Sequence, residues 1–192
     1  MTLDEVKRHI EKHLPGVALK PVRESLLVEN PLDLPRVVEF LKADGVLQLN
    51  YLSSVTGVDY LTFLECVYHL YSMENKTYSL QLRVRVDREN PHVPSLVPIF
   101  RGAEFQEREA YDMYGFQFDG HPDLRRILMW DGYVGYPMRK DYKQEDSEVL
   151  DRDDIEWLQK HGVSVAEEHI KMAESLQTGG ESEQPESEQT EG

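Results

Sequence analysis

A strictly alternating stretch at residues 78–86 constrains the fold of this chain more than any other feature. Its apolar side consists of Leu80, Leu82, Val84 and Val86, and its polar side of Ser79, Gln81, Arg83 and Arg85. A period of two predicts a strand with one buried face and one face that is wet or covered. The stretch from Thr62 to Tyr71 predicts a second strand, and Met73 to Lys76 predict the hairpin turn between them. The chain must therefore build an antiparallel sheet and cover its apolar face.

The segments around this hairpin predict the remaining elements of an α+β domain. Thr2 to Glu5 have the spacing of a capping box, which predicts a helix that ends at Pro15-Gly16. Short strands are expected at 17–20, 25–28 and 47–51, and a second helix is expected between Asp33 and Gly45. A last helix ends at Gly115. This order predicts a mostly antiparallel sheet with helices packed on one face, followed by an extended C-terminal partner-binding arm.

The run from Glu107 to Tyr142 concentrates charged and aromatic residues together with glycine and proline. Gly115 is expected to end the helix with a positive φ, and Phe116 to Phe118 to continue as an extended piece. Gly120-His121-Pro122 is expected to turn the chain. Arginine suits bidentate contact with carboxylates, and tyrosine and tryptophan are enriched at protein interfaces. The run therefore predicts a stiff segment docked on this domain's own core or on another subunit.

Charge and cysteine content exclude several classes of protein. Acidic residues exceed basic ones by 36 − 21 = 15, whereas nucleic-acid binding and polybasic membrane anchoring both require basic surfaces. The single cysteine, Cys66, can form neither an internal disulfide nor an iron–sulfur or zinc site, which fits a reduced, intracellular setting. No signal peptide and no apolar run of about 20 residues is visible, so we expect membrane contact only through a partner.

The residue pattern gives little support for an active site within this chain. On a helix, Arg108 lies one turn from Glu104 and from Asp112, which suits surface ion pairs, a structural network at an interface with another protein or, least of all, catalysis. We favour the network. His121 has no second metal ligand nearby and is expected to be a turn residue. Since no phosphate-binding glycine loop is present, we predict no catalytic, cofactor-binding or metal site.

Basic residues within the run allow three interpretations. They are Arg125, Arg126, Arg139 and Lys140. They could keep the surface soluble, bind a substrate phosphate, or anchor the chain to carboxylates of a partner. In an acidic chain, clustered cations favour the anchoring interpretation.

A set of matched positions gives the run a specific resemblance. It comprises Glu107-Arg108-Glu109, Tyr111-Asp112-Met113-Tyr114-Gly115, Phe118, Gly120-His121-Pro122, Leu124-Arg125-Arg126-Ile127-Leu128 and Gly135-Tyr136-Pro137-Met138-Arg139-Lys140-Asp141-Tyr142. This signature at 107–142 resembles the 30 kDa subunit of respiratory complex I, the proton-translocating NADH:quinone oxidoreductase. The segment Thr56-Gly57-Val58-Asp59-Tyr60 is also similar to an element of that family.

The resemblance implies a non-catalytic structural subunit in the peripheral arm of an enzyme complex, at the cytoplasmic face of the bacterial cell membrane. It implies that FMN and iron–sulfur clusters belong to partner subunits, and that this chain docks on the 49 kDa subunit, which helps to form the quinone site. The residues carried over as partner-docking or fold-fixing are Glu107, Arg108, Asp112, His121, Arg125, Arg126, Arg139, Lys140 and Asp141.

The sequence thus predicts an α+β domain at 1–115, a docking arm at 116–150, a helical segment at 151–176 and a disordered acidic tail at 177–192. One alternative keeps the fold and places it in a membrane-bound energy-converting hydrogenase or in a quinone dehydrogenase with another electron donor. An alternative of another class is a free-standing hydrolase that uses Glu107, Asp112 and His121.

Overall fold

The structure is a computed structural model that describes residues 2–75, 79–130, 132–142 and 152–162, with single positions at 164–165, 167 and 170–171. Residues 1–143 form one compact unit and residues 144–192 a second one. In the second unit the predicted helix is present as α4 (Arg152–Lys160). The predicted helix at 165–176 falls mostly, and the predicted tail entirely, outside the described residues.

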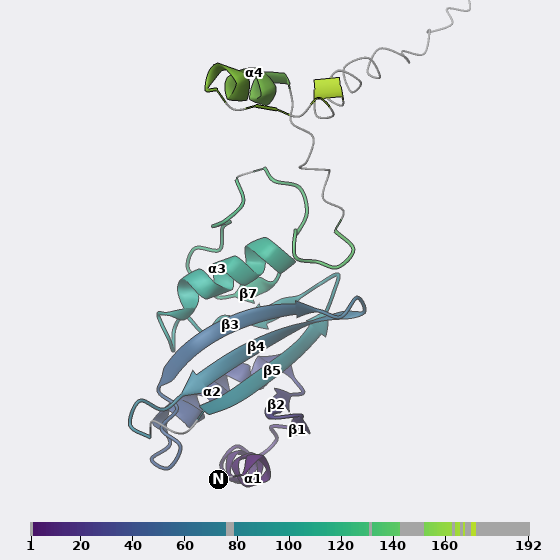
Figure 1. Cartoon of the computed structure of the whole chain (residues 1–192). Helices are drawn as coiled ribbons and strands as arrows, with labels where there is room; N and C mark the ends of the chain where they lie inside the picture. The colour runs from purple at the N-terminus through teal and green to yellow at the C-terminus, as the bar shows by residue number, and fades with distance from the viewer. Residues whose placement is uncertain are drawn as a thin grey trace, which may run out of the picture. The chain divides into compact units, whose positions relative to one another are not determined.

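A five-stranded mixed sheet organises the first unit (Figure 1). Its strands are β1 (Leu19–Val22), β2 (Ser25–Val28), β3 (Tyr51–Asp59), β4 (Phe63–Tyr71) and β5 (Ser79–Asp87), and their order is β1-β2-β5-β4-β3. All neighbours pair antiparallel except β2 and β5, which pair parallel. The hairpin predicted from the alternating stretch is confirmed, since Leu64 to Leu70 of β4 pair with Val86 to Leu80 of β5.

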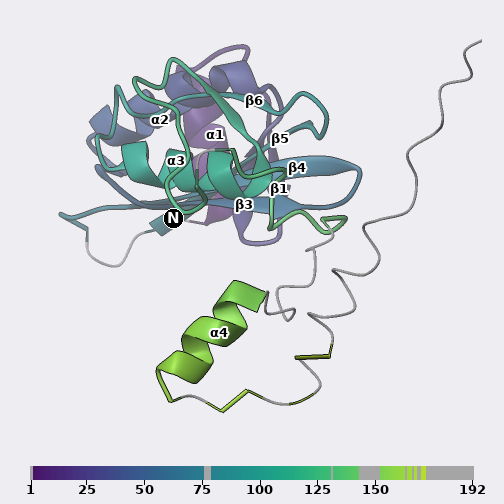
Figure 2. The same cartoon turned by 90° about the horizontal axis from the view of Figure 1, so that it is seen from above.

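Three helices cover one face of this sheet, as the sequence predicts. They are α1 (Leu3–His13), α2 (Leu34–Ala43, preceded by a 3-10 turn, η1, at Pro31–Asp33) and α3 (Ala103–Tyr114). In Figure 2 all three lie on the same side of β3 and β4. Their buried residues join those of the strands in one apolar core. The capping box at Thr2 is present, because its hydroxyl accepts from the Glu5 amide and Glu5 accepts from the Thr2 amide.

The strand predicted at residues 47–51 is wrong, because β3 begins only at Tyr51. Leu47 and Leu49 are buried and so give an alternating pattern, but they belong to a turn in which Gln48 has a φ of 49°. The Asp44 carboxylate holds this turn by accepting from the amide of Leu47. The true strand was hard to recognise because polar residues and Gly57 weaken its apolar alternation.

The chain after α3 follows a path of little regular structure. Gly115 ends the helix with a φ of 85°, as predicted. A two-stranded parallel sheet then joins β6 (His92–Pro94) to β7 (Gln117–Asp119). From Gly120 to Tyr142, the described residues include neither helix nor strand. This segment belongs to the same compact unit as the sheet.

Candidate docking surface

Asp112 is the buried centre of the signature. It lies in the last turn of α3, and none of its surface is exposed. One carboxylate oxygen accepts from the amides of Ile127, Leu128 and Met129 at 3.0, 2.7 and 2.8 Å. The other accepts from Arg126 at 2.6 Å. Burial alone would raise the pKa of Asp112, but these bonds outweigh it and hold the pKa below its ordinary value. Asp112 therefore stays charged and fixes the start of the arm.

Arg126 extends this network along the arm. Besides Asp112, its guanidinium donates to the carbonyl oxygens of Tyr133 and Gly135, both at 3.0 Å. It also lies over the rings of Tyr133 and Tyr136. A planar group with five donors is suited to hold several carbonyls at once. Arg126 thus closes the arm into a loop at the end of α3, and its side chain is only 14% exposed.

Arg108 holds the same loop from one turn earlier in α3. Its guanidinium donates to the carbonyl oxygens of Arg125 and Arg126 at 3.1 and 3.0 Å, and the residue is 5% exposed. The predicted pairs of Arg108 with Glu104 and Asp112 are absent from the described part of the chain. The helix spacing permitted them, but the arm's carbonyl oxygens are the acceptors that the guanidinium reaches.

Glu107 faces the opposite way, into the core. The residue is fully buried, and its carboxyl accepts from the hydroxyl of Ser95 at 2.6 Å and from the amide of Leu96 at 2.7 Å. No cation lies against it among the described residues. Burial raises the pKa of Glu107 to about 7, although the two hydrogen bonds oppose that rise. Glu107 therefore ties the crossing segment before α3 to the helix and is not exposed at the surface.

The end of the arm is held by Asp59, the last residue of β3, and by Arg88, which follows β5. Asp59 accepts two bonds from Arg88, at 3.2 and 3.1 Å, and one from the amide of Lys140 at 2.9 Å. Burial would raise the pKa of Asp59, but Arg88 and the amides lower it to about 2. Arg88 also pairs with Asp141, and it lowers the pKa of that carboxyl. Arg139 donates to the carbonyl oxygen of Tyr114 at 2.7 Å.

The last two predicted residues, His121 and Arg125, lie in and just after the turn that follows β7. His121 donates from Nε2 to the carbonyl oxygen of Glu104 at 3.0 Å and accepts at Nδ1 from the amide of Asp123 at 3.0 Å. Both ring nitrogens are thus engaged with backbone, as expected of a turn residue. The Arg125 side chain is 66% exposed and pairs with Asp123 at 2.8 Å.

The nine predicted residues therefore lie along one path rather than around one point. Asp112, Arg108 and Arg126 meet at the start of the arm, whereas Arg139, Lys140 and Asp141 lie at its end. Glu107 lies apart in the core. Arg88 was not predicted from the sequence, because it lies between strands and outside any recognisable motif. Asp59 was visible only through the family element at residues 56–60.

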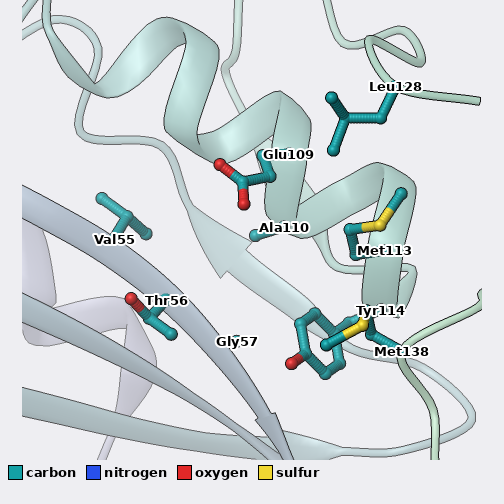
Figure 3. Close-up of a pocket in the computed structure, with 9 residues that line it drawn as sticks. All are labelled: Val55, Thr56, Gly57, Glu109, Ala110, Met113, Tyr114, Leu128 and Met138. Carbon is teal, nitrogen blue, oxygen red and sulfur yellow. The ribbon is translucent and has the colours of Figure 1, made fainter.

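A cavity of about 260 Å³ opens between β3 and α3, beside the arm (Figure 3). Its lining consists of Val55, Thr56, Gly57, Glu109, Ala110, Met113, Tyr114, Leu128 and Met138. Large apolar side chains are also exposed along the arm. They are Ile127, Leu128, Trp130, Val134 and Met138, with exposed fractions from 37% to 85%. Neither the cavity nor this exposed apolar series was predicted from the sequence.

The described part of the chain lacks two other kinds of feature. No three His, Cys, Asp or Glu side chains are arranged to hold a metal ion there. Nor does any helix there combine the length and the apolar character needed to cross a bilayer. What the described surface offers is a set of exposed apolar side chains on an arm held by buried ion pairs.

These features define a class of protein, an α+β domain whose C-terminal arm is fixed onto its own last helix. A family model described as the 30 Kd subunit of respiratory-chain NADH dehydrogenase matches residues 27–148. The match covers more than half of the chain, so the chain belongs to this family. The matched segment includes β3 to β7, α3 and the arm.

Curated relatives agree with this assignment, and a solved structure shares the fold. An NADH-quinone oxidoreductase subunit of Rhizobium meliloti is 45% identical over 115 residues, which cover 58% of this chain and 62% of the relative. An NADH-quinone oxidoreductase subunit of Caulobacter vibrioides is 40% identical over 145 residues, 73% of each chain. The chain thus spans about 60% of the length of the first relative. A chain of an archaeal respiratory membrane complex, the membrane-bound sulfane sulfur reductase, shares the fold with a TM-score of 0.63 at 23% identity, covering 78% of this chain and 93% of that one.

Proposed function

We propose that this chain is a structural subunit of a proton-translocating NADH:quinone oxidoreductase. In such a complex, electrons pass from NADH through FMN and iron–sulfur clusters to quinone. We place these cofactors in partner subunits and none in this chain. We further propose that the chain docks on the 49 kDa subunit and that it lies at the cytoplasmic face of the bacterial cell membrane, where the complex provides its membrane contact.

The observation that carries this proposal is which groups the charged signature residues contact. Both oxygens of Asp112 are occupied by Arg126 and three amides, and Arg108 is directed at backbone carbonyl oxygens. A general acid, base or nucleophile must instead face a reacting group. The same bonds leave apolar side chains of the arm in solvent, and exposed apolar surfaces of this kind mark sites of protein association. The network therefore supports a docking role rather than a catalytic one.

Native purification tests the proposal. A tagged full-length chain, purified from detergent-solubilised membranes, should carry with it the 49 kDa subunit, the nucleotide-binding subunit and NADH:quinone reductase activity. Deletion of the gene should abolish that activity. The proposal is wrong if the chain purifies without these partners, or if the isolated chain itself turns over a substrate. Recovery with a hydrogenase subunit or another electron-donor subunit would move the chain to a different assembly.

A further inference from the structure

The cavity beside β3 is fixed at both ends. At one end the Gln106 side-chain oxygen accepts from the amide of Val55 at 2.6 Å and ties α3 to the strand. At the other end the ring of Tyr114 lies so close to Gly57 that a Cβ there would come within 2.5 Å of it. Because both tethers set the distance between helix and strand, the space between them cannot simply collapse.

The residue midway between these tethers explains why the space stays open. Ala110 lies one turn from Gln106 and one turn from Tyr114, so these three residues share the helix face toward β3. Figure 3 shows Ala110 and Glu109 directed from α3 toward the strand. The methyl group of Ala110 is too small to fill a gap that a larger residue would close. The cavity is thus a built feature of the helix–strand contact.

The rim of the cavity has a distinct chemistry. Leu128 and Met138 border it and are 58% and 55% exposed, and Met113 adds a second thioether. Methionine side chains adapt to the shape of an incoming group. Glu109 is the acidic side chain at the rim, and it forms no ion pair with any residue that the structure describes. The rim therefore offers apolar contact on one side and a carboxylate on the other.

We propose that this cavity receives one apolar side chain of a partner polypeptide, such as Leu, Met or Phe, with an adjacent Lys or Arg that pairs with Glu109. The volume of about 260 Å³ admits a single large side chain. A cation beside the apolar group matches both Glu109 and the net charge of −15 on this chain. The inference rests on the proposed function, because the partner is a subunit of the same complex.

Two pairs of full-length variants test the docking site. Leu128→Asp with Met138→Asp places charge on the apolar rim, and Leu32→Asp, at a residue that is 73% exposed, is the matched control. Glu109→Lys reverses the rim charge, and Glu39→Lys, at an exposed position of α2, is its control. Recovery of the complex from membranes should fall about tenfold for the first variant of each pair. The controls should stay within about twofold of wild type, as expected for substitutions outside an interface core.

Crosslinking identifies the occupant. A photoreactive residue in place of Met138, which lines the cavity and is exposed, should crosslink to a peptide of a partner subunit that contains an apolar residue next to Lys or Arg. A crosslink to lipid or quinone instead would overturn the inference. So would full recovery of complex by the rim variants while the wild-type chain still co-purifies with its partners, a result that leaves the proposed function standing. Failure of the wild-type chain to co-purify would defeat both. Thermal melting of each variant separates lost docking from lost folding.

Discussion

Glu107 gives the sharpest test of the physical reasoning, because burial and charge compete at this residue. Its carboxyl is enclosed between α3 and the sheet and faces Ser95, Leu96, Cys66 and Tyr68, without a cation among the described residues. The unfolded chain releases the Glu107 proton at the ordinary pKa, whereas the folded chain keeps it up to about 7. Between these two values, rising pH therefore favours the unfolded state.

The size of the effect follows from the displacement of the pKa. The pKa of Glu107 moves from 4.5 to about 7 on folding. Since one unit corresponds to about 1.4 kcal/mol, the free energy of unfolding should fall by about 3 kcal/mol between pH 4.5 and pH 7 and stay level above it. Glu107→Gln keeps the shape and an oxygen acceptor for Leu96, but it cannot ionise. The variant should match the wild type near pH 5 and exceed its stability by about 3 kcal/mol at pH 8.

Urea denaturation of both full-length proteins, followed by far-ultraviolet circular dichroism from pH 5 to pH 8, measures this difference directly. Subtraction of the two profiles removes the contributions of all other titrating groups that the proteins share. Glu109→Gln, at the exposed neighbouring carboxylate, should give the profile of the wild type. If the wild type and Glu107→Gln give parallel profiles over this range, the reasoning about buried charge is refuted.

Three further predictions concern the arm and the sheet. Arg126→Ala, or Asp112→Ala, should lower the free energy of unfolding by about 3–5 kcal/mol because each leaves its buried partner unpaired, whereas the exposed Arg125→Ala should change it by no more than about 0.5 kcal/mol; urea melts compare them. Gly57→Ala forces a methyl group against the adjoining tyrosine ring and should cost about 1–3 kcal/mol in the same assay. Asp59 has a lowered pKa, so it contributes about 2 kcal/mol above its ordinary pKa that is lost as pH falls through about 2. Asp59→Asn should therefore be less stable than the wild type at pH 7 and similar to it near pH 2, which acid unfolding curves would show.

The fold could be predicted where local pattern and tertiary role agree. The alternation of β5 and the glycine at position 115 each reflect a local requirement, either one buried face or one positive φ. Prediction failed at β3, where Gly57 is required by the close approach of Tyr114 on α3 rather than by the strand itself. That approach is a contact between distant segments, and a single sequence does not display it.

The candidate site was predictable in its members but not in their partners. The charges of the signature mark Asp112 and Arg126 as important, yet their spacing suggested ion pairs along the helix or with another subunit. The structure instead pairs Asp112 with Arg126 between helix and arm, and it adds backbone amides and carbonyls of the arm around both. Backbone groups are the same at every position, so sequence pattern cannot show which of them a side chain will reach. The cavity was invisible for a related reason, since it arises where Ala110 is too small for its surroundings.

Because the charged residues contact groups within this chain, a partner must bind other groups. An arm without helix or strand would lose conformational entropy when a partner ordered it. Here Asp112, Arg126 and Arg108 hold its start and Asp59 holds its end within this chain. The arm has therefore already lost this conformational entropy when the chain folds, before a partner binds. Association then depends on groups that the arm leaves exposed, chiefly the apolar rim at Leu128 and Met138. The buried charges should accordingly govern the stability of the folded chain, whereas the apolar rim should govern its assembly.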